Sequence, residues 1–591
     1  MKRLGRLQIS AAALLALGAM PAVAQMQKEK DDFRPPTPPA VEQTDDYSPV
    51  TDARLLKPEA ENWLMTRGNY EGWSYSPLDK INAGNVSKMV PIWSYSTGAN
   101  SGHQAPPIVN NGVMFVSTPG AQVLALNART GELVWKYKRE LPEDFSALHN
   151  TNRGVALYGD KVYVTGLEPV VIALDAKTGK VVWEAKMEDY KTGYYATLAP
   201  LIVNGKVMAG VSGGEFGIRG FVVAYDSETG KEVWKSYTVP APGEPGSETW
   251  EKPDTWKRGG ASVWMTGNYD PDTKLTFWGT GNASPWFGDQ RPGDNLYTSS
   301  TIALDPDTGK MSAHFQYHQN DSWDWDEMNA PMVVNFTKNG KEIKGLLKPS
   351  RNGYLYWLSR STSGIDYVAS TNYVKQDVFK SIDAKGRPVI DDSKKPGTGK
   401  KASFCPSLWG GKDWPYEAYN PKTGMVYIPA NENHCGFLEG KVQEYVAGKW
   451  WTGVDIPDIG FVVDKKPPYL GVLQAWDVSG GKKVWEHKFN ESMHWGPVLT
   501  TAGGLVFAGG TNDRKFRAHD AQTGKLLWEM GTNSGIIAPP SSYAIDGKQY
   551  IAVVSGWGVD PQFQQGLINN LTGWKKEVPE GGVIWVFGIP D

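Results

Sequence analysis

The sequence predicts an all-β protein, an eight-bladed β-propeller with tryptophan-docking repeats. One motif recurs along the 591 residues: an apolar strand ending at Asp or Asn, a Thr-Gly turn and, in the fuller copies, a second strand ending in Trp. This pattern is typical of a β-hairpin, because an Asx side chain and a turn glycine both favour a tight reversal. The clear copies begin at Ala125, Ala173, Ala224, Ala303, Ala418, Ala475 and Ala518.

The spacing of the copies gives the blade count. Most turn glycines are separated by about 40–50 residues, the length of one four-stranded blade. The interval from Gly309 to Gly424 has room for a missing copy, and Gly353–Asp366 supplies a degenerate one. Seven clear copies and one degenerate copy give eight blades. Because an open edge strand invites aggregation, we expect Val90–Tyr95 and Gly582–Phe587 to share a closing blade. An open β-solenoid is the alternative.

The Trp at a fixed place in the repeat is suited to packing between neighbouring sheets, because it buries a large area and keeps one polar group. Trp264 lies outside the repeat register, so blade packing does not account for it. The repeat alone accounts for Trp135, Trp183, Trp234, Trp485 and Trp528.

The N-terminus has the features of a secretory signal peptide over residues 1–24: a basic start, an apolar stretch at Ile9–Met20 and small residues before Gln25. Residues 25–60 are rich in charge and proline and are expected to form an irregular arm. Residues 61–591 are then the propeller domain. We expect export to the periplasm and no membrane span, since the apolar stretches are too short to cross a bilayer.

Charge and cysteine content narrow the function classes. The formal net charge is −3 and only 21% of residues are charged, so we expect no nucleic-acid partner. The two cysteines, Cys405 and Cys435, are most simply a disulfide in an exported protein, with two buried thiols as the alternative. Two cysteines in this arrangement also exclude a C-x-x-C-H haem attachment site.

Three polar segments interrupt the repeat, at 212–217, 279–286 and 320–326. Each follows an apolar strand and brings glycines together with Glu, Asn or Asp side chains. Segments of this kind at blade ends can converge near the propeller axis. Hard cations take oxygen ligands, so the three together predict a metal site, although each alone is more simply a turn.

At these segments the chain resembles the pyrroloquinoline quinone (PQQ)-dependent alcohol dehydrogenases, the methanol and ethanol dehydrogenase family of eight-bladed propellers. The resemblance covers nearly the whole chain and rests on Gly-Thr-Gly-Asn-x-x-Pro-Trp, Trp-Asp-Trp-Asp, the Trp repeat and the Cys405/Cys435 spacing. It implies periplasmic oxidation of a small alcohol to an aldehyde or ketone, with electrons passed to a separate soluble c-type cytochrome. A homodimer is left open. The alternatives are a PQQ-dependent sugar or polyol dehydrogenase and, in another class, a non-catalytic propeller scaffold.

The resemblance also implies residue roles. Glu215, Asn282 and Asp324 would hold a metal that acts as Lewis acid on the quinone, while Asp324 takes the hydroxyl proton and the hydride moves to quinone C5. Arg351 would hydrogen-bond the reactive carbonyl, and Trp264 would stack on the flat cofactor. The other implied cofactor contacts are Arg153, Thr197, Ser212, Gly213, Gly214, Ser262, Asp413, Trp495 and Trp557.

Two departures from the family concern the other face of the quinone. The family's adjacent Cys-Cys pair is absent, and Ala147-Leu148 stands in its place. Gln104 stands where methanol dehydrogenases have Glu. We therefore expect the upper face to be built differently, by Leu148 or His149.

The prediction of the metal depends on Asp326, two positions after Asp324. An Asp at this position resembles the lanthanide-dependent branch of the family. In an extended segment, residues i and i+2 point the same way, so both carboxylates can reach one ion. Together with Glu215 they would give three carboxylates, which suit a trivalent ion. We expect a lanthanide(III) ion. Ca²⁺ with a solvent-facing Asp326 is the alternative.

Overall fold

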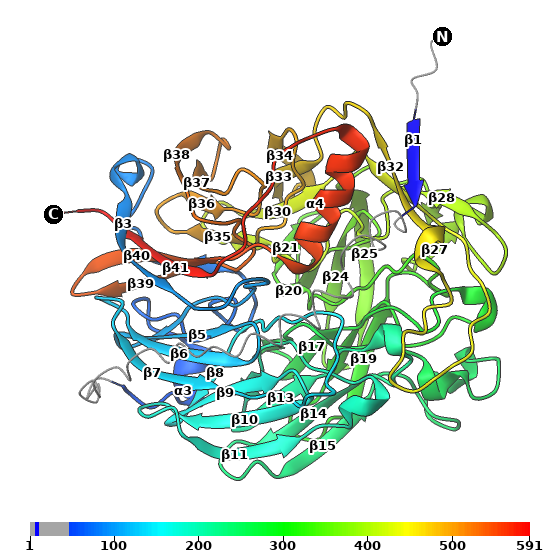
Figure 1. Ribbon diagram of the computed structural model, residues 1–591, viewed down its shortest axis with the longest axis horizontal. Coiled ribbons are helices and arrows are strands. Elements are labelled where there is room, and N and C mark those ends of the chain that lie inside the picture. Colours follow the sequence, from blue (N-terminus) through cyan, green and yellow to red (C-terminus); the bar gives the residue numbers. More distant parts are fainter. Residues whose placement is uncertain (1–5, 11–46, 591) are drawn as a thin grey trace.

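The computed structural model describes residues 6–10 and 47–590, so most of the predicted leader and part of the predicted arm lie outside the described residues. Strands dominate these residues, and successive sheets follow one another around the molecule from the blue through the green to the orange part of the chain (Figure 1). The all-β prediction is confirmed.

Eight of the sheets share one design, in which four antiparallel strands lie side by side. The short strand β2 adds to one of them in parallel. Sheet by sheet, the strands are β4 (Ile108–Asn110), β5 (Val113–Thr118), β6 (Gln122–Asn127) and β7 (Leu133–Lys138); β8 (Ala156–Tyr158), β9 (Lys161–Gly166), β10 (Val170–Asp175) and β11 (Val181–Lys186); β12 (Leu201–Val203), β13 (Lys206–Gly210), β14 (Phe221–Asp226) and β15 (Glu232–Tyr237); β16 (Asn268–Asp270), β17 (Leu275–Gly279), β18 (Ser300–Leu304) and β19 (Met311–Gln316); β20 (Met332–Val333), β23 (Gly345–Pro349), β24 (Tyr354–Arg360) and β25 (Ile365–Asn372); β29 (Ala418–Asn420), β30 (Met425–Asn431), β33 (Gly471–Asp477) and β34 (Lys482–Phe489); β2 (Tyr75–Ser76), β35 (Val498–Thr501), β36 (Leu505–Ala508), β37 (Lys515–Asp520) and β38 (Leu526–Gly531); and β3 (Val90–Ser96), β41 (Val583–Gly588), β40 (Lys548–Ser555) and β39 (Ser541–Ile545).

A ninth sheet also has four antiparallel strands, β1 (Arg6–Ser10), β32 (Ile459–Asp464), β31 (His434–Leu438) and β28 (Ala402–Phe404). Two of them, β31 and β32, lie in the excursion between β30 and β33 of another sheet. The two-stranded hairpins are β21 (Phe336–Lys338) with β22 (Lys341–Ile343) and β26 (Phe379–Ile382) with β27 (Pro388–Ile390). The helices are α3 (Asp52–Leu56), α4 (Val559–Thr572) and the 3-10 turns η1 (Val86–Lys88), η2 (Tyr190–Thr192), η3 (Gly214–Phe216), η4 (Ser247–Thr249), η5 (Thr255–Arg258), η6 (Gly288–Gln290), η7 (Asp392–Lys394) and η8 (Ile456–Asp458).

Two of these elements differ from the sequence expectations. The backbone of β1, inside the predicted leader, pairs antiparallel with β32. Inside the predicted irregular arm, α3 forms because the Thr51 hydroxyl accepts a hydrogen bond from the Arg54 amide and Leu55 is buried. Among the described helices none is long and apolar enough to cross a membrane.

The predicted repeat hairpins form with a constant register. In the hairpin of β6 and β7, Ala125 lies opposite Trp135, and the register shifts by a bulge directly after the alanine. The same alanine–tryptophan pair and bulge recur at Ala173 and Trp183. The degenerate copy also forms a bulged hairpin, β24 with β25. A bulge increases local twist, so each hairpin reaches the next sheet at a similar angle.

The assignment of one blade to every repeat copy is wrong in one place. The copies at Ala418 and Ala475 fall in the same sheet, β29-β30-β33-β34. Between β30 and β33 the chain leaves to build β31 and β32, which separates two strands of one sheet by a long excursion. The sheet that no repeat copy accounts for is that of β3 and β39–β41. Its pairing of β3 with β41 confirms that the two ends of the domain share a sheet.

Tryptophans join neighbouring sheets as predicted. The Trp135 indole donates to the Ala176 carbonyl at 2.9 Å, in the turn of the next sheet. The turn glycine lies against the ring: a Cβ at Gly179 would be 2.5 Å from Cε3 of Trp135. Four more pairs repeat this contact: Trp93 with Gly131, Trp183 with Gly230, Trp234 with Gly309, and Trp485 with Gly524.

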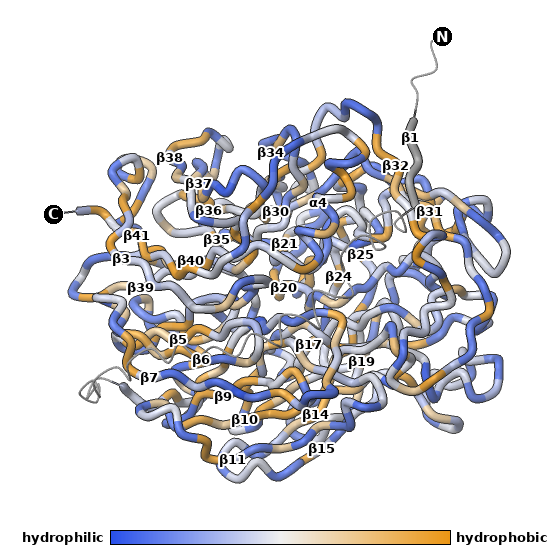
Figure 2. Tube along the Cα trace, viewed as in Figure 1, coloured by the Kyte–Doolittle hydropathy of each residue, from blue (hydrophilic) through white to orange (hydrophobic). Residues whose placement is uncertain are grey.

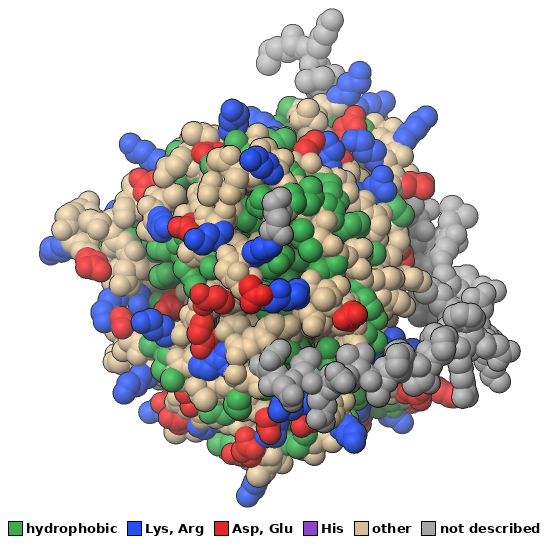
Figure 3. All heavy atoms as spheres, turned by 90° about the vertical axis from the view of Figure 1, so that its left-hand side faces the viewer, with side chains coloured by type: hydrophobic (Ala, Val, Ile, Leu, Met, Phe, Trp, Pro, Cys, Tyr) green, Lys and Arg blue, Asp and Glu red, His purple; other side chains and the backbone are tan. Residues whose placement is uncertain are grey.

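The core runs along the inner strands, and the surface is of mixed charge. Strands such as β5 and β6 are fully buried for most of their length and carry hydrophobic residues (Figure 2). On the face shown in Figure 3, acidic and basic side chains are interspersed with hydrophobic ones. No region of single charge sign stands out in that view.

The turn–tryptophan contact predicts a large difference between two similar substitutions. Gly179 and Gly424 both have φ near +69°, but a Cβ at Gly424 would meet nothing within 4 Å. Gly424→Ala should cost only the left-handed strain, about 1 kcal/mol, whereas Gly179→Ala adds a clash with Trp135 and should cost roughly 2–4 kcal/mol. Urea unfolding of both variants measures the difference. Equal midpoints would contradict the docking role of Gly179.

Candidate active site

A single deep pocket gathers most of the polar residues singled out in the sequence. Its volume is about 850 Å³, and the segments 212–215, 262–264 and 324–326 all reach it. Eleven of the predicted site residues line it: Arg153, Thr197, Ser212, Gly213, Glu215, Ser262, Trp264, Asp324, Asp326, Arg351 and Asp413.

The four other predicted residues lie outside the lining. Gly214 and Asn282 are immediately behind it, since a Cβ at Gly214 would lie 2.7 Å from the Asn282 Oδ1. Trp495 and Trp557 are fully buried in a hydrophobic cluster that Trp264 packs against. These two indoles therefore support the floor of the pocket rather than its surface.

The Trp-Asp-Trp-Asp segment is an anchored loop. Trp323 and Trp325 are fully buried, stack 5.2 Å apart, and donate their indole N–H groups to the carbonyls of Lys394 and Ser407. The two tryptophans are buried in the core, whereas Asp324 and Asp326 line the pocket. Asp324 has φ +63°, a left-handed conformation rare outside glycine and typical of strained functional positions.

This loop geometry corrects the extended-segment argument. Both Asp324 and Asp326 reach the pocket, but the φ of Asp324 breaks the extended backbone on which the i, i+2 rule depends. Within the described part of the chain, no group of three or more Asp, Glu, His or Cys side chains is arranged so that it could hold a metal ion. The carboxylates of Glu215, Asp324 and Asp326 therefore share a pocket without being clustered.

Asp326 is held from two sides. The Trp264 indole N–H donates to Asp326 Oδ2 at 2.6 Å, and the Asn282 backbone N–H donates to Oδ1 at 2.9 Å. The first bond fixes the orientation of the Trp264 ring, and the second joins two of the three polar segments. The carboxylate thus links the stacking surface to the acidic side of the pocket.

Arg351 is clamped beside the same loop. Its guanidinium donates to the Asp324 carbonyl at 2.7 Å and to the Asp413 carboxylate, and it lies 3.9 Å from Asp324 Oδ2. Its backbone N–H donates to Glu327 Oε1 at 3.1 Å. Glu327 also accepts from the Ser350 hydroxyl, so the loop and the turn that carries Arg351 are tied together on both sides.

Several buried acceptors here have no hydrogen-bond partner within the described residues. Asp324 Oδ1 and Asn282 Oδ1 are both in this state. A buried polar atom without a partner costs free energy unless something binds it. Carboxylate and amide oxygens are the donors that hard cations take, so the site fits an oxygen-ligated metal ion.

Comparisons with known proteins identify the family. The family described as "PQQ: Glucose/ethanol/alcohol dehydrogenase, beta-propeller domain" matches residues 63–366 and 465–551. The quinoprotein alcohol dehydrogenase PedH of Pseudomonas putida is 38% identical over 576 residues, covering 92% of this chain and 94% of PedH. PedE of the same organism is 37% identical over 570 residues, covering 88% of each chain.

The chain belongs to the quinoprotein alcohol dehydrogenase family. A solved structure of a europium-containing methanol dehydrogenase superposes with a TM-score of 0.85 and 34% identity, over 91% of this chain and 99% of the other. The family match and these relatives show that this quinoprotein has the family's β-propeller domain and is an enzyme.

Burial shapes the charge states of the quinoprotein pocket. Burial raises the pKa of Asp326 to about 7, although Arg351 and the Trp264 hydrogen bond oppose it. Burial and the Asp326 charge raise the pKa of Asp324 well above its ordinary value. Burial also raises the pKa of Glu215 and lowers that of Arg153 to about 10. Desolvated carboxyls that repel one another keep their protons until a cation replaces them.

Arg153 covers the stacking surface in this structure. Its guanidinium lies 4.7 Å from the centre of the Trp264 ring and 5.7 Å from that of Trp414. It also donates to the Thr197 hydroxyl. The contact between a guanidinium cation and an indole ring is energetically favourable. A planar anion that stacks on Trp264 would lie next to the Arg153 guanidinium and could form an ion pair with it.

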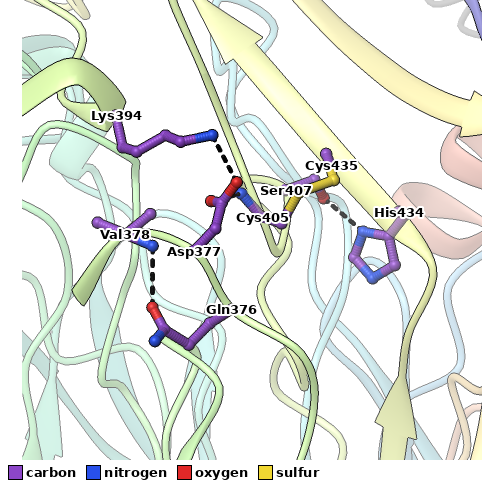
Figure 4. The surroundings of a disulfide bond; sticks show 8 residues. All are labelled: Gln376, Asp377, Val378, Lys394, Cys405, Ser407, His434 and Cys435. Atoms are coloured by element: carbon purple, nitrogen blue, oxygen red, sulfur yellow. Dashed lines mark hydrogen bonds and ion pairs between the residues drawn. A yellow bond between two sulfur atoms is a disulfide. The ribbon is translucent and has the colours of Figure 1, made fainter. Parts of the chain in front are cut away.

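The disulfide supports another wall of the pocket. Cys405 and Cys435 are bonded, and the neighbouring Ser407 hydroxyl lies 2.9 Å from His434 Nδ1 (Figure 4). The segment that follows Cys405 brings Leu408, Trp409 and Asp413 to the pocket. The disulfide therefore pins the start of that segment to β31.

The apolar wall of the pocket was not predicted. Trp409 stacks on Phe461 at 3.7 Å between centroids, and α4 contributes Asp560 and Phe563. These residues come from excursions between repeats, where periodicity carries no information. The only local sequence signal for α4 is the Gly-Trp-Gly run at 556–558, which directly follows β40 and marks the end of that strand.

The charge states predict that metal binding strengthens as pH rises. Asp326 must lose its proton to become a ligand, so below about pH 7 a cation competes with that proton. Terbium(III) binding to quinone-free protein, followed by tryptophan-sensitised luminescence, should tighten by about tenfold per pH unit or more between pH 5.5 and 7, because Asp324 and Glu215 also have raised pKa values. Asp326→Asn removes one of these protons and should make the dependence less steep. The prediction fails if the wild type binds terbium equally at both ends of the range.

Proposed function

We propose that this quinoprotein holds PQQ and one metal ion in the pocket and oxidises a small alcohol to an aldehyde or ketone there. The observation that carries the proposal is the meeting of an acidic loop, a clamped arginine and a half-buried indole in the lining of one pocket. When bound, the quinone would accept the hydride and the ion would act as a Lewis acid.

The chain's residues divide into a stacking side and a ligand side. Trp264 offers its ring face, and its indole N–H is already used by Asp326, so the ring cannot turn freely. Around the ring, the cationic and hydroxyl donors that would meet the carboxylates of the quinone are Arg153, Thr197, Ser212 and Ser262. The oxygen ligands proposed for the ion are Glu215, Asn282, Asp324 and Asp326.

Asp324 is the proposed base for the alcohol proton. Its Oδ1 is buried, has no hydrogen-bond partner within the described residues, and belongs to a side chain that lines the pocket. Arg351 donates to its carbonyl and stands 3.9 Å from Oδ2, so the carboxylate is held in place and partly neutralised. A carboxylate is a weak base, and proximity in a site shielded from water compensates for that.

A lanthanide(III) ion is the metal we propose, with Ca²⁺ as the alternative. Three carboxylates, those of Glu215, Asp324 and Asp326, line the pocket and would offset a trivalent charge. The structural relative with a TM-score of 0.85 is a europium-containing enzyme. Asp326 would have to exchange its present hydrogen bonds for a metal bond, or keep them and bind with its remaining lone pairs.

Three wider proposals concern the location of the protein, its electron acceptor and its ring of blades. The N-terminal features and the disulfide support export to the periplasm. Without a C-x-x-C-H motif, electrons would leave for a separate c-type cytochrome, and a homodimer stays open. We also propose that the eight four-stranded antiparallel sets form one eight-bladed ring, supported by the tryptophan contacts that join neighbouring sheets.

Replacing Asp324 tests the proposed base. Asp324→Asn keeps the shape and an oxygen donor but removes the proton acceptor, so turnover should fall by about 10²–10⁴-fold. The measurement is dye-coupled alcohol oxidation by protein reconstituted with PQQ and metal. Absorbance of bound quinone must be the same in variant and wild type for the comparison to count. Turnover within a few-fold of wild type would remove Asp324 from the mechanism.

Replacing Asp326 tests the metal. Metal-free protein reconstituted with PQQ should be active with lanthanum or cerium and weakly active with calcium. Asp326→Ala removes one negative charge, so the preference should shift toward calcium. Activities with each ion, for wild type and variant, give the comparison. Full wild-type activity with calcium and none with lanthanum or cerium would reject the lanthanide proposal.

A further inference from the structure

The pocket contains an ion pair that the proposed chemistry does not use. His149 Nε2 and Asp560 Oδ1 lie 2.8 Å apart, and both residues line the pocket. His149 belongs to the segment between β7 and β8, and Asp560 to the first turn of α4, so the pair joins parts of the chain 411 residues apart. We propose that this pair closes the pocket over the bound quinone and slows its release. The inference rests on the proposed function, because it concerns the quinone of that site.

The two segments approach the pocket with matching side chains. On α4, Asp560, Phe563 and Gln564 all line the pocket, as expected for positions i, i+3 and i+4 on one helical face. On the other side, Leu148 precedes His149 and also lines the pocket. Leu148 and Phe563 are 39% and 44% exposed, so an apolar side chain stands at the rim beside each charged one.

The backbone around the pair holds the two segments within reach of each other. The Gly102 N–H donates to the Trp557 carbonyl at 3.3 Å, and the Gly102 carbonyl accepts from the Thr151 hydroxyl at 2.6 Å. A Cβ at Gly102 would lie 3.4 Å from Cγ2 of Val559. The segment around Gly102 thus lies between the two sides, and the His149–Asp560 pair closes the gap beyond it with side chains.

The charges around the pair favour its ionised form. The Asp560 carboxylate outweighs burial and raises the pKa of His149, which favours the charged imidazole and hence the ion pair. Arg153, over the Trp264 ring, contributes to the same electrostatics by lowering the pKa of Asp560.

A cover held by one partly exposed ion pair opens easily. His149 and Asp560 are about one quarter exposed, which places the pair between surface and buried ion pairs in strength. Losing it should not unfold the domain, because the segments keep their backbone contacts to Gly102. It should instead let α4 and the 147–149 segment separate more often, which shortens the residence time of the quinone.

The test is the release rate of PQQ from reconstituted holoenzyme. Four proteins are compared: wild type, Asp560→Asn, His149→Gln and the double variant. Each is loaded with PQQ and lanthanum and then diluted into an excess of tagged, PQQ-free wild-type protein, which captures the PQQ that is released. Each single variant should release PQQ about five- to tenfold faster than wild type, and the double variant no faster than either single one, because both remove the same pair. Asp546→Asn, which breaks an exposed pair with Arg129 outside the pocket lining, is the matched control and should leave release unchanged.

The outcomes separate this inference from the proposed function. If wild type never takes up PQQ, the proposed function fails. If wild type holds PQQ but both single variants release it at the wild-type rate, or if the two effects simply add, the cover is not this pair. Thermal unfolding of the same variants and terbium binding to their quinone-free forms should match wild type. A single variant that unfolds at a lower temperature or no longer binds terbium is misfolded. The release rate of the other single variant then tests the proposal.

Discussion

The contact between a tryptophan of one sheet and the turn of the next is the constraint on which the rest of the structure depends. The indole satisfies a carbonyl that would otherwise be unpaired at the turn, and its ring needs a surface without a Cβ. Each contact fixes the position of one sheet against its neighbour. The polar segments between repeats can then converge from different sheets on one pocket without having to stabilise the fold themselves.

The pocket shows the cost of gathering carboxylates in a buried place. Glu215, Asp324 and Asp326 are all desolvated there, and burial raises the pKa of each. The protein offsets part of this with the Arg351 guanidinium and with N–H groups from Trp264 and Asn282. The pocket still has an excess of negative charge and buried oxygen acceptors without hydrogen-bond donors. A bound cation would compensate for both. The site is thus prepared for a ligand by being unfavourable without one.

The sequence predicts the scaffold and the polar side of the pocket well, and the apolar side poorly. The hairpins follow from a repeating local pattern, in which Asp, Thr and Gly determine the turn, so they are readable without tertiary information. The polar residues were found because they break that pattern. Trp409, Phe461 and the face of α4 obey no period, and their place depends on how long excursions fold back. The repeat count failed at Ala418 and Ala475 for the same reason, since one sheet is split by an excursion.

The sheet shared by β3 and β41 has a consequence for how the protein is made. One of its strands is among the first described elements of the chain and three are among the last. Every other sheet of this design except that of β2 can be assembled from strands that emerge from the ribosome in order. This one waits until β41 has been made, and until then the strand β3 lacks the partner it has in the folded sheet. The growing chain therefore carries an unpaired strand edge, open to aggregation, while all the residues between β3 and β41 are added.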